Sequence, residues 1–260
     1  MLKVRVIPTL LWKGVGLVKG IGFDSWRRVG TVMPAIKVYN MRQVDELIIV
    51  DITATTEDRS PDYDAINEFS SECFVPLTVG GGIKSIADIK NLLRAGADKV
   101  CINSSAYGNP SLIREASEKF GSQCIVVSID ARRKADGSYE CYRHRGTQAT
   151  GKEPGTWAKE MEEMGAGEIL ITSIENDGTM KGYNLELIEM VAECVNIPVI
   201  ASGGAGNYHH MYEAISVSHA SAVAAASIFH FTQQTPMEAK QYLSSQGVPV
   251  RNVNIRTVIG

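Results

Sequence analysis

The sequence predicts a single (β/α)8 barrel of the α/β class. Three observations support this prediction: short apolar runs alternate with helical patterns, the pattern repeats at half the chain length, and 260 residues are enough for one such barrel. We expect one domain over residues 1–260, with half-repeats at about 1–123 and 124–251. An open doubly wound sheet is the alternative, but the first strand lacks the glycine fingerprint of a dinucleotide-binding turn.

Eight apolar runs of strand length are expected to form the wall of the barrel. They lie near residues 4–11, 46–51, 75–79, 99–103, 124–130, 168–173, 198–202 and 222–226. The segments between them have the apolar spacing of amphipathic helices, as in Ser85–Leu93. Parallel strands need such crossover helices, so the alternation favours a parallel sheet that closes on itself.

The half-chain repeat is visible at both ends of the expected strands. The glycine pairs Gly81-Gly82 and Gly203-Gly204 are 122 positions apart, and so are Glu46 and Glu168. A repeat of this length indicates a duplicated half rather than a series of short units. Equivalent positions in the two halves can therefore be compared.

The comparison sets Leu11 against Asp130. Each residue ends an apolar run that leads into a loop, at an offset of 119 positions. A carboxylate at a strand end is suited to general acid or base chemistry if partial burial raises its pKa. Leu11 can neither donate nor accept a proton, so the halves differ in the chemistry they can perform.

The C-terminal ends of the strands are where such a barrel holds its functional residues. Two clusters that combine glycines with hydroxyl or amide side chains follow these strands, and each predicts a phosphate site. The first cluster is Gly81, Gly82, Asn103 and Ser104, and the second is Gly203, Gly204 and Ser227. We expect a ligand with a phosphate at each end to lie across the mouth of the barrel.

The candidate catalytic residues are expected near the same mouth. They are Asp130 as general acid or base, the position of Leu11, Asp51, Lys19 and Asp177. Asp51 is equally consistent with a salt bridge that orders a loop. Asp177 precedes a glycine and is also consistent with an ordinary turn.

Four charged residues stand at the opposite, N-terminal ends of the strands. Arg5, Glu46, Lys99 and Glu168 lie at the starts of the first, second, fourth and sixth expected strands. Because buried charges must be paired, two acids and two bases predict a closed ring of salt bridges around the barrel axis. Such a ring would form a gate at the bottom of the barrel.

Composition limits the partners and the compartment. A net charge of −3 gives no reason to expect nucleic acid or an anionic membrane surface as a partner. The five cysteines and five histidines lack metal-ligand spacing, and neither an apolar leader nor a run of about 20 apolar residues is present. We expect a cytoplasmic protein that uses no metal or other cofactor.

Several motifs together resemble the HisF family, the cyclase subunit of imidazole glycerol phosphate synthase. The resemblance runs from about residue 2 to 251 and rests on the stretches Thr78–Ile83, Gly96–Val100, Gly121–Gln123, Gly165–Leu170, Asp177–Thr179 and Ala201–Gly206. It implies that a HisH-like glutaminase docks at the bottom of the barrel. Ammonia would then pass the gate residues and travel through the barrel to a bisphosphate substrate at the mouth.

The resemblance also implies two catalytic aspartates, at Asp130 and at position 11, where this chain has leucine. Loss of an acid or base of this kind typically costs roughly 10²- to 10⁴-fold in rate. The chain thus most resembles HisF-like paralogues of surface-polysaccharide and lipopolysaccharide gene sets. These work with a HisH-like glutaminase and a sugar amidotransferase to place an acetamidino group on a sugar.

Two alternatives stay open at the level of sequence. The first is a genuine cyclase subunit of histidine biosynthesis in which another acid replaces position 11. The second is a bisphosphate-sugar isomerase barrel without ammonia transfer, in which the charged gate would have no purpose.

Overall fold

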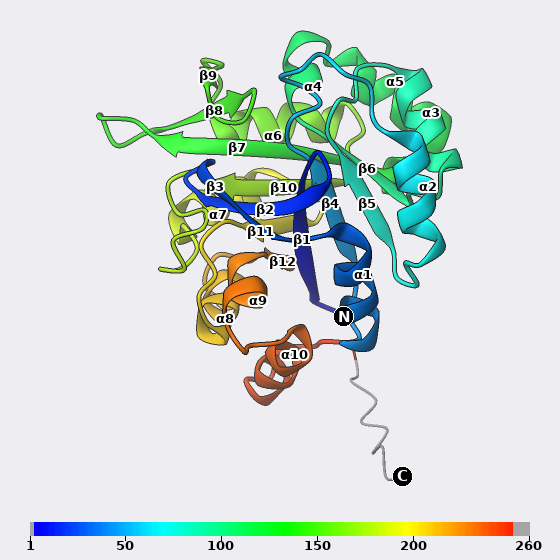
Figure 1. Cartoon of the computed structure of the whole chain (residues 1–260). Helices are drawn as coiled ribbons and strands as arrows, with labels where there is room; N and C mark the ends of the chain where they lie inside the picture. The colour runs from blue at the N-terminus through cyan, green and yellow to red at the C-terminus, as the bar shows by residue number, and fades with distance from the viewer. Residues whose placement is uncertain (1–2, 252–260) are drawn as a thin grey trace.

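Eight parallel strands close into a barrel in the computed structural model, which describes residues 3–251 (Figure 1). Residues 1–2 and 252–260 of the expected domain lie outside this range. The barrel strands, in order around the wall, are β1 (Arg5–Lys13), β4 (Leu47–Asp51), β5 (Leu77–Gly80), β6 (Lys99–Ile102), β7 (Ile125–Arg133), β10 (Glu168–Ser173), β11 (Val199–Ser202) and β12 (Ala222–Ala225). β12 pairs with β1 in parallel, so the barrel has no open edge.

Helices cover the outside of the barrel (Figure 1). They are α1 (Val32–Met41), α2 (Tyr63–Ser71), α3 (Ile86–Arg94), α4 (Ser104–Gly108), α5 (Ser111–Phe120), α6 (Pro154–Glu163), α7 (Leu185–Cys194), α8 (Tyr208–Ser216), α9 (Ser227–Phe231) and α10 (Pro236–Ser245), with a 3-10 turn at Ser122–Cys124. The expected helix near 85–93 is α3. Ser85 and Asp88 form a capping box at its start, which satisfies backbone N–H groups that would otherwise lack partners.

All eight expected strands are present, and the closed barrel excludes the doubly wound alternative. The largest difference at the start of a strand is at β5, which begins at Leu77 rather than near residue 75. Pro76 has no N–H to donate to the ladder, although its carbonyl accepts a hydrogen bond from Leu47 N–H at 2.9 Å.

Two antiparallel hairpins at the mouth were not expected from the sequence. β2 (Gly16–Ile21) and β3 (Asp24–Gly30) follow β1, whereas β8 (Tyr139–Arg143) and β9 (Gln148–Ala149) follow β7. Each hairpin continues the pairing of its barrel strand beyond the wall. β1 and β7 therefore end two to three residues later than expected.

The side chains of each strand divide between two apolar regions. On β1, Val6 and Leu10 pack in the core between the barrel and the helices, whereas Ile7 belongs to a smaller cluster inside the barrel. This alternation is the period of two that strands impose. It leaves Arg5, Ile7, Thr9 and Leu11 as successive inward positions from the bottom of the barrel to its mouth.

No helix within residues 3–251 combines the length and the apolar character that crossing a membrane requires.

Candidate active site

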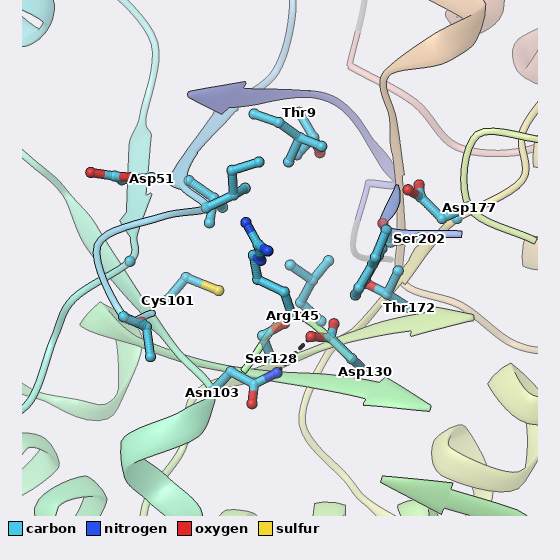
Figure 2. A pocket seen from close by; sticks show the side chains of 18 of the residues that line it. Thr9, Asp51, Cys101, Asn103, Ser128, Asp130, Arg145, Thr172, Asp177 and Ser202 are labelled. Carbon is cyan, nitrogen blue, oxygen red and sulfur yellow. Dashed lines mark hydrogen bonds between the residues drawn. The ribbon is translucent and has the colours of Figure 1, made fainter. Parts of the chain in front are cut away.

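A cavity of about 320 Å³ opens at the C-terminal mouth of the barrel. Figure 2 shows side chains from several strands and loops that converge on it, among them Thr9, Asn103, Asp130 and Thr172. The cavity extends down to Cys101 and Leu170, which belong to the apolar cluster inside the barrel. The top of this apolar cluster therefore forms the floor of the cavity.

Both expected phosphate clusters line this one cavity. The residues of the first cluster and those of the second all contribute to its wall, so one ligand can contact both. Gly81 and Gly204 have φ angles of 103° and 114°, and a Cβ atom at either position would overlap a neighbouring carbonyl oxygen. Backbone geometry alone therefore requires glycine at these two positions, whatever the ligand.

Two side-chain atoms of these clusters lack a hydrogen-bond partner among residues 3–251. Asn103 Oδ1 and Ser227 Oγ are buried and make no hydrogen bond among the described residues. The N–H of Gly82 is different, because it donates to Thr55 Oγ1 at 3.2 Å. Buried polar groups are normally satisfied, so Asn103 and Ser227 mark positions where a ligand or water can bind.

Asp130 is a carboxylic acid poised to exchange a proton near neutral pH. It lines the cavity, and its Oδ2 accepts a 2.8 Å hydrogen bond from Asn103 Nδ2. Burial, together with the negative charge of Asp177, raises the pKa of Asp130 to about 7. A group with this pKa can act as either acid or base at physiological pH.

Leu11 and Asp130 occupy equivalent places in the two halves of the barrel. Leu11 is the first residue of β1 to pair with its hairpin, opposite Val18, and Asp130 is the first of β7 to do so, opposite Tyr142. Both line the cavity. The structure thus puts an apolar side chain where the other half supplies the acid.

Lys19 and Asp177 form an ion pair beside the cavity. Lys19 Nζ lies 2.7 and 2.6 Å from the two carboxylate oxygens, and both residues are buried. Gly22 N–H also donates to the Asp177 carbonyl at 2.9 Å. The pair therefore joins the β2–β3 hairpin to the loop after β10, across the mouth.

Burial and the nearby charge of Lys19 keep a neighbouring histidine neutral. Burial, with the positive charge of Lys19, lowers the pKa of His230 to about 4. His230 thus contributes no positive charge to the site at neutral pH.

Asp51 orders a loop in the structure. Its Oδ1 accepts hydrogen bonds from the N–H groups of Thr53 and Ala54, and its Oδ2 lies 3.2 Å from Arg59 Nη2. The carboxylate points away from the centre of the cavity in Figure 2. Of the two interpretations of Asp51, the geometry favours the loop-ordering salt bridge.

Sequence reasoning missed one residue at the centre of the site. Arg145, in the turn between β8 and β9, lines the cavity, and Figure 2 shows its side chain between Thr9, Cys101 and Asp130. The missed signal is the basic run at Arg143-His144-Arg145, which follows β7 on the functional face of the barrel.

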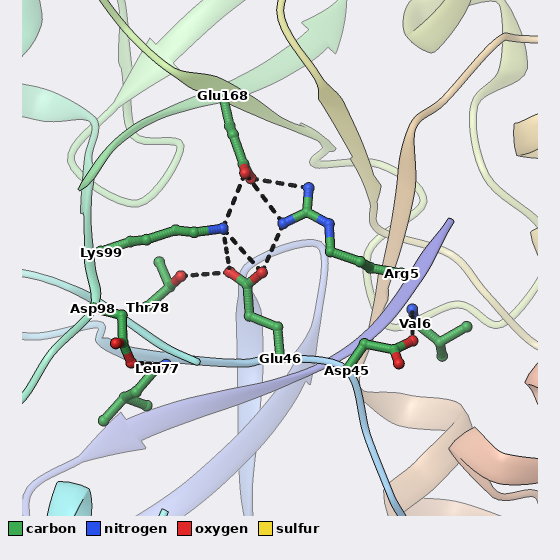
Figure 3. Close-up of polar contacts among 9 residues, drawn as sticks. All are labelled: Arg5, Val6, Asp45, Glu46, Leu77, Thr78, Asp98, Lys99 and Glu168. Carbon is green, nitrogen blue, oxygen red and sulfur yellow. Dashed lines mark hydrogen bonds and ion pairs between the residues drawn. The ribbon is translucent and has the colours of Figure 1, made fainter. Parts of the chain in front are cut away.

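The four charged residues at the N-terminal face form a closed ring of ion pairs (Figure 3). Arg5 lies 2.7 Å from Glu46 and 3.1 Å from Glu168, and Lys99 lies 3.0 Å and 2.9 Å from the same acids. Thr78 Oγ1 donates to Glu46 Oε1 at 2.7 Å. Each cation therefore bridges both acids, and each acid contacts both cations.

The two acids of the ring favour the charged form of Arg5. Burial alone would lower the pKa of Arg5, but the charges and hydrogen bonds of Glu168 and Glu46 raise it above its usual value. Above the ring, the barrel interior is apolar and includes Ile7, Ile48, Cys101, Val126, Leu170 and Ile200. Only a small neutral molecule could cross this layer without a large desolvation cost.

Within residues 3–251, no group of three His, Cys, Asp or Glu side chains is arranged to hold a metal ion.

Comparison with protein-family models gives a match over nearly the whole chain. The model described as "Histidine biosynthesis protein" matches residues 5–235. This range includes all eight barrel strands, the ring at the N-terminal face and the residues that line the cavity at the mouth.

Proposed function

Because the chain belongs to the histidine biosynthesis protein family, whose members are barrel enzymes, we propose that it is a HisF-like subunit of a glutamine amidotransferase. In this proposal a HisH-like glutaminase docks at the N-terminal face and releases ammonia there. The ammonia passes the charged ring, crosses the apolar interior and reaches a phosphorylated ligand in the mouth. The single observation that carries the proposal is the closed ring of Arg5, Glu46, Lys99 and Glu168 on the axis below the cavity.

The ring has the properties that an ammonia gate needs. Arg5 bridges both acids by itself, so Lys99 can swing aside without leaving either carboxylate unpaired. Lysine carries a compact charge on a flexible chain, which suits a movable element. Ammonia is small and uncharged, so the apolar layer above the ring admits it more readily than an ion.

The N-terminal face also has features that favour a protein partner. Met41, at the end of α1, and Phe74, just before β5, are 74% and 79% exposed. Contiguous exposed apolar surface is typical of interaction sites, and we propose that these two side chains belong to such a surface. Both residues lie at the end of the barrel that holds the ring.

Leu11 favours a paralogue that serves another substrate. Asp130 and both glycine clusters are retained at the mouth, but the second acid of paired acid–base chemistry is replaced by leucine. We propose that ammonia delivered to this mouth serves the amidination of a surface-polysaccharide sugar, with a sugar amidotransferase as a further partner. The genuine cyclase subunit of histidine biosynthesis is the second candidate, favoured by the pKa of about 7 at Asp130.

Turnover of the cyclase substrate separates the two candidates. The purified protein is mixed with ammonium salt and the bisphosphate substrate of imidazole glycerol phosphate synthase, and product formation is followed. We expect no turnover above background, with retained phosphate binding at the mouth. Turnover at a rate typical of a cyclase would contradict the paralogue and favour the second candidate.

The gate itself is tested in the complete glutamine-dependent reaction, with a HisH-like glutaminase, a sugar amidotransferase and the acceptor sugar that consumes ammonia all present. Lys99→Met should increase the ammonia that escapes to solvent for each glutamine hydrolysed, whereas Lys90→Met, on the exposed face of α3, should not. Equal escape from the two variants would contradict a gating role for Lys99.

A further inference from the structure

Arg145 has a buried donor for which residues 3–251 supply no hydrogen-bond partner. Its Nε atom is inaccessible to solvent and makes no hydrogen bond among residues 3–251. None of the acids of this described region lies within ion-pair distance of its guanidinium. A guanidinium cannot lose its proton in a protein, so this positive charge persists in the cavity.

The other cations that line the cavity are already paired. Lys19 is bound to Asp177, and Lys84 is bound to Asp58. Asp130, whose pKa is about 7, carries only part of a negative charge at neutral pH. Arg145 is therefore the cation whose charge this cavity leaves without compensation.

The backbone fixes where Arg145 can point. His144, Arg145 and Gly146 all have left-handed conformations, with φ angles of 50°, 58° and 73°. Such conformations cost energy in non-glycine residues and tend to occur at functional sites.

Contacts on both sides hold this turn in place. His144 N–H donates to Ser104 Oγ of the first glycine cluster at 3.1 Å. On the other side, a Cβ atom at Gly146 would lie 3.1 Å from Ile174 and 3.2 Å from Phe23. The turn is thus wedged between a phosphate cluster and the β2–β3 hairpin, and Arg145 extends from it into the cavity.

We propose that Arg145 binds an oxyanion of the ligand between the two glycine clusters, so that the ligand carries a third anionic group. This inference rests on the proposed function in one respect, namely that the ends of the ligand bind in those clusters. The planar guanidinium offers parallel N–H donors that match a carboxylate or a phosphate. Leu11 is consistent with this ligand, because an aspartate there would add negative charge to the same cavity.

The test measures oxyanion binding in three proteins: the unaltered chain, Arg145→Gln and Arg143→Gln. Arg143 is a matched control because it lies on the same hairpin, does not line the cavity and contacts Gln148 instead. Calorimetric titration with inorganic phosphate is followed by crystal structures that locate the bound ions. A parallel titration with acetate distinguishes a carboxylate site from a phosphate site.

We expect phosphate in both clusters of all three proteins and a further oxyanion on Arg145. Arg145→Gln should lose only this third ion, with affinity at that position reduced by about tenfold to a hundredfold. Tighter competition by acetate at the third position would identify a carboxylate there. Weaker competition would identify a phosphate.

Failure of the Arg145 assignment and failure of the proposed function would give different results in this test. Phosphate in both clusters, with no ion at Arg145 or with equal binding by Arg145→Gln and Arg143→Gln, would overturn the assignment of Arg145. Absence of phosphate from both clusters in all three proteins would instead count against the phosphorylated ligand of the proposed function.

Discussion

The two ends of the barrel differ in whether their buried polar groups have hydrogen-bond or ion-pair partners. At the N-terminal face, Arg5, Lys99, Glu46 and Glu168 all find partners within the ring, and Thr78 completes the contacts of Glu46. At the mouth, buried atoms of four lining residues have no partner among residues 3–251. These atoms are Thr9 Oγ1, Asn103 Oδ1, Arg145 Nε and Ser227 Oγ.

This difference separates an element whose polar groups are paired with one another from one whose unpaired polar atoms a ligand can satisfy. A closed ring leaves none of its four charges unpaired, so loss of one member is costly, and the ring must rearrange before anything passes it. Unpaired donors and acceptors in a cavity reduce the stability of the empty protein, and a bound molecule can satisfy them. The barrel therefore has a self-paired ring of charges at one end and a cavity with unpaired polar atoms at the other, with an apolar interior between them.

Removing one cation from the ring should have the largest effect. Arg5→Met leaves Glu46 and Glu168 with only Lys99 between them, so the free energy of unfolding should fall by about 3–5 kcal/mol. Arg94→Met, at the exposed end of α3, is the matched control and should change it by less than about 0.5 kcal/mol. Urea denaturation measures both, and equal stability of the two variants would show that the ring is not a stabilising unit.

Placing an acid at position 11 of the mouth should change the catalytic activity of the protein and leave its folded structure intact. Leu11→Asp places a carboxylate in the cavity with Asp130, and we expect cyclase turnover with ammonia to rise to about 100-fold over the background rate that the unaltered chain shows. This corresponds to about 2.7 kcal/mol of the activation barrier. The same substitution combined with Asp130→Asn should lose the gain. Unchanged inactivity of a correctly folded Leu11→Asp protein would show that Leu11 is not what blocks the cyclase reaction.

The raised pKa of Asp130 should make the mouth sensitive to pH. The folded carboxyl keeps a proton up to about pH 7 that the unfolded chain releases near pH 4, so stability should fall as the pH rises through this window. Asp130→Asn removes this dependence. Its free energy of unfolding should equal that of the unaltered chain near pH 4 and exceed it by about 2 kcal/mol at pH 8, after allowance for partial exposure.

Urea titrations at both pH values measure this effect of Asp130. Asp51→Asn is the contrasting variant, because Asp51 bonds to two N–H groups and to Arg59. A stability gain at pH 8 in both variants would mean that general charge reduction, rather than the burial of Asp130, is responsible.

The barrel and its ring could be predicted because both follow from short-range patterns. Strands of four to nine residues repeat with helices between them, and the strand starts at Arg5, Lys99 and Glu168 align the charges on one face. The half-chain repeat also placed Leu11 against Asp130, and the paired hairpins show the same equivalence.

The mouth could be predicted only in part, because its geometry depends on the hairpins. The sequence does not show that β2 and β3 would fold back over the barrel, so it did not predict the contact between Lys19 and Asp177, which are far apart in the chain. Arg145 was missed for the same reason. Its direction depends on three left-handed residues and on Ser104, none of which periodicity reveals.

The most direct test of this contrast removes one threonine hydroxyl from each end of the barrel. Thr78→Val removes a buried donor to Glu46, whereas Thr9→Val removes a buried hydroxyl that has no partner in the described part of the chain. Urea denaturation of the ligand-free proteins gives the two free energies of unfolding. We expect a loss of about 1.5 kcal/mol for Thr78→Val, and no loss or a small gain for Thr9→Val. Equal losses would contradict the claim that the ring is complete by itself while the mouth awaits a ligand.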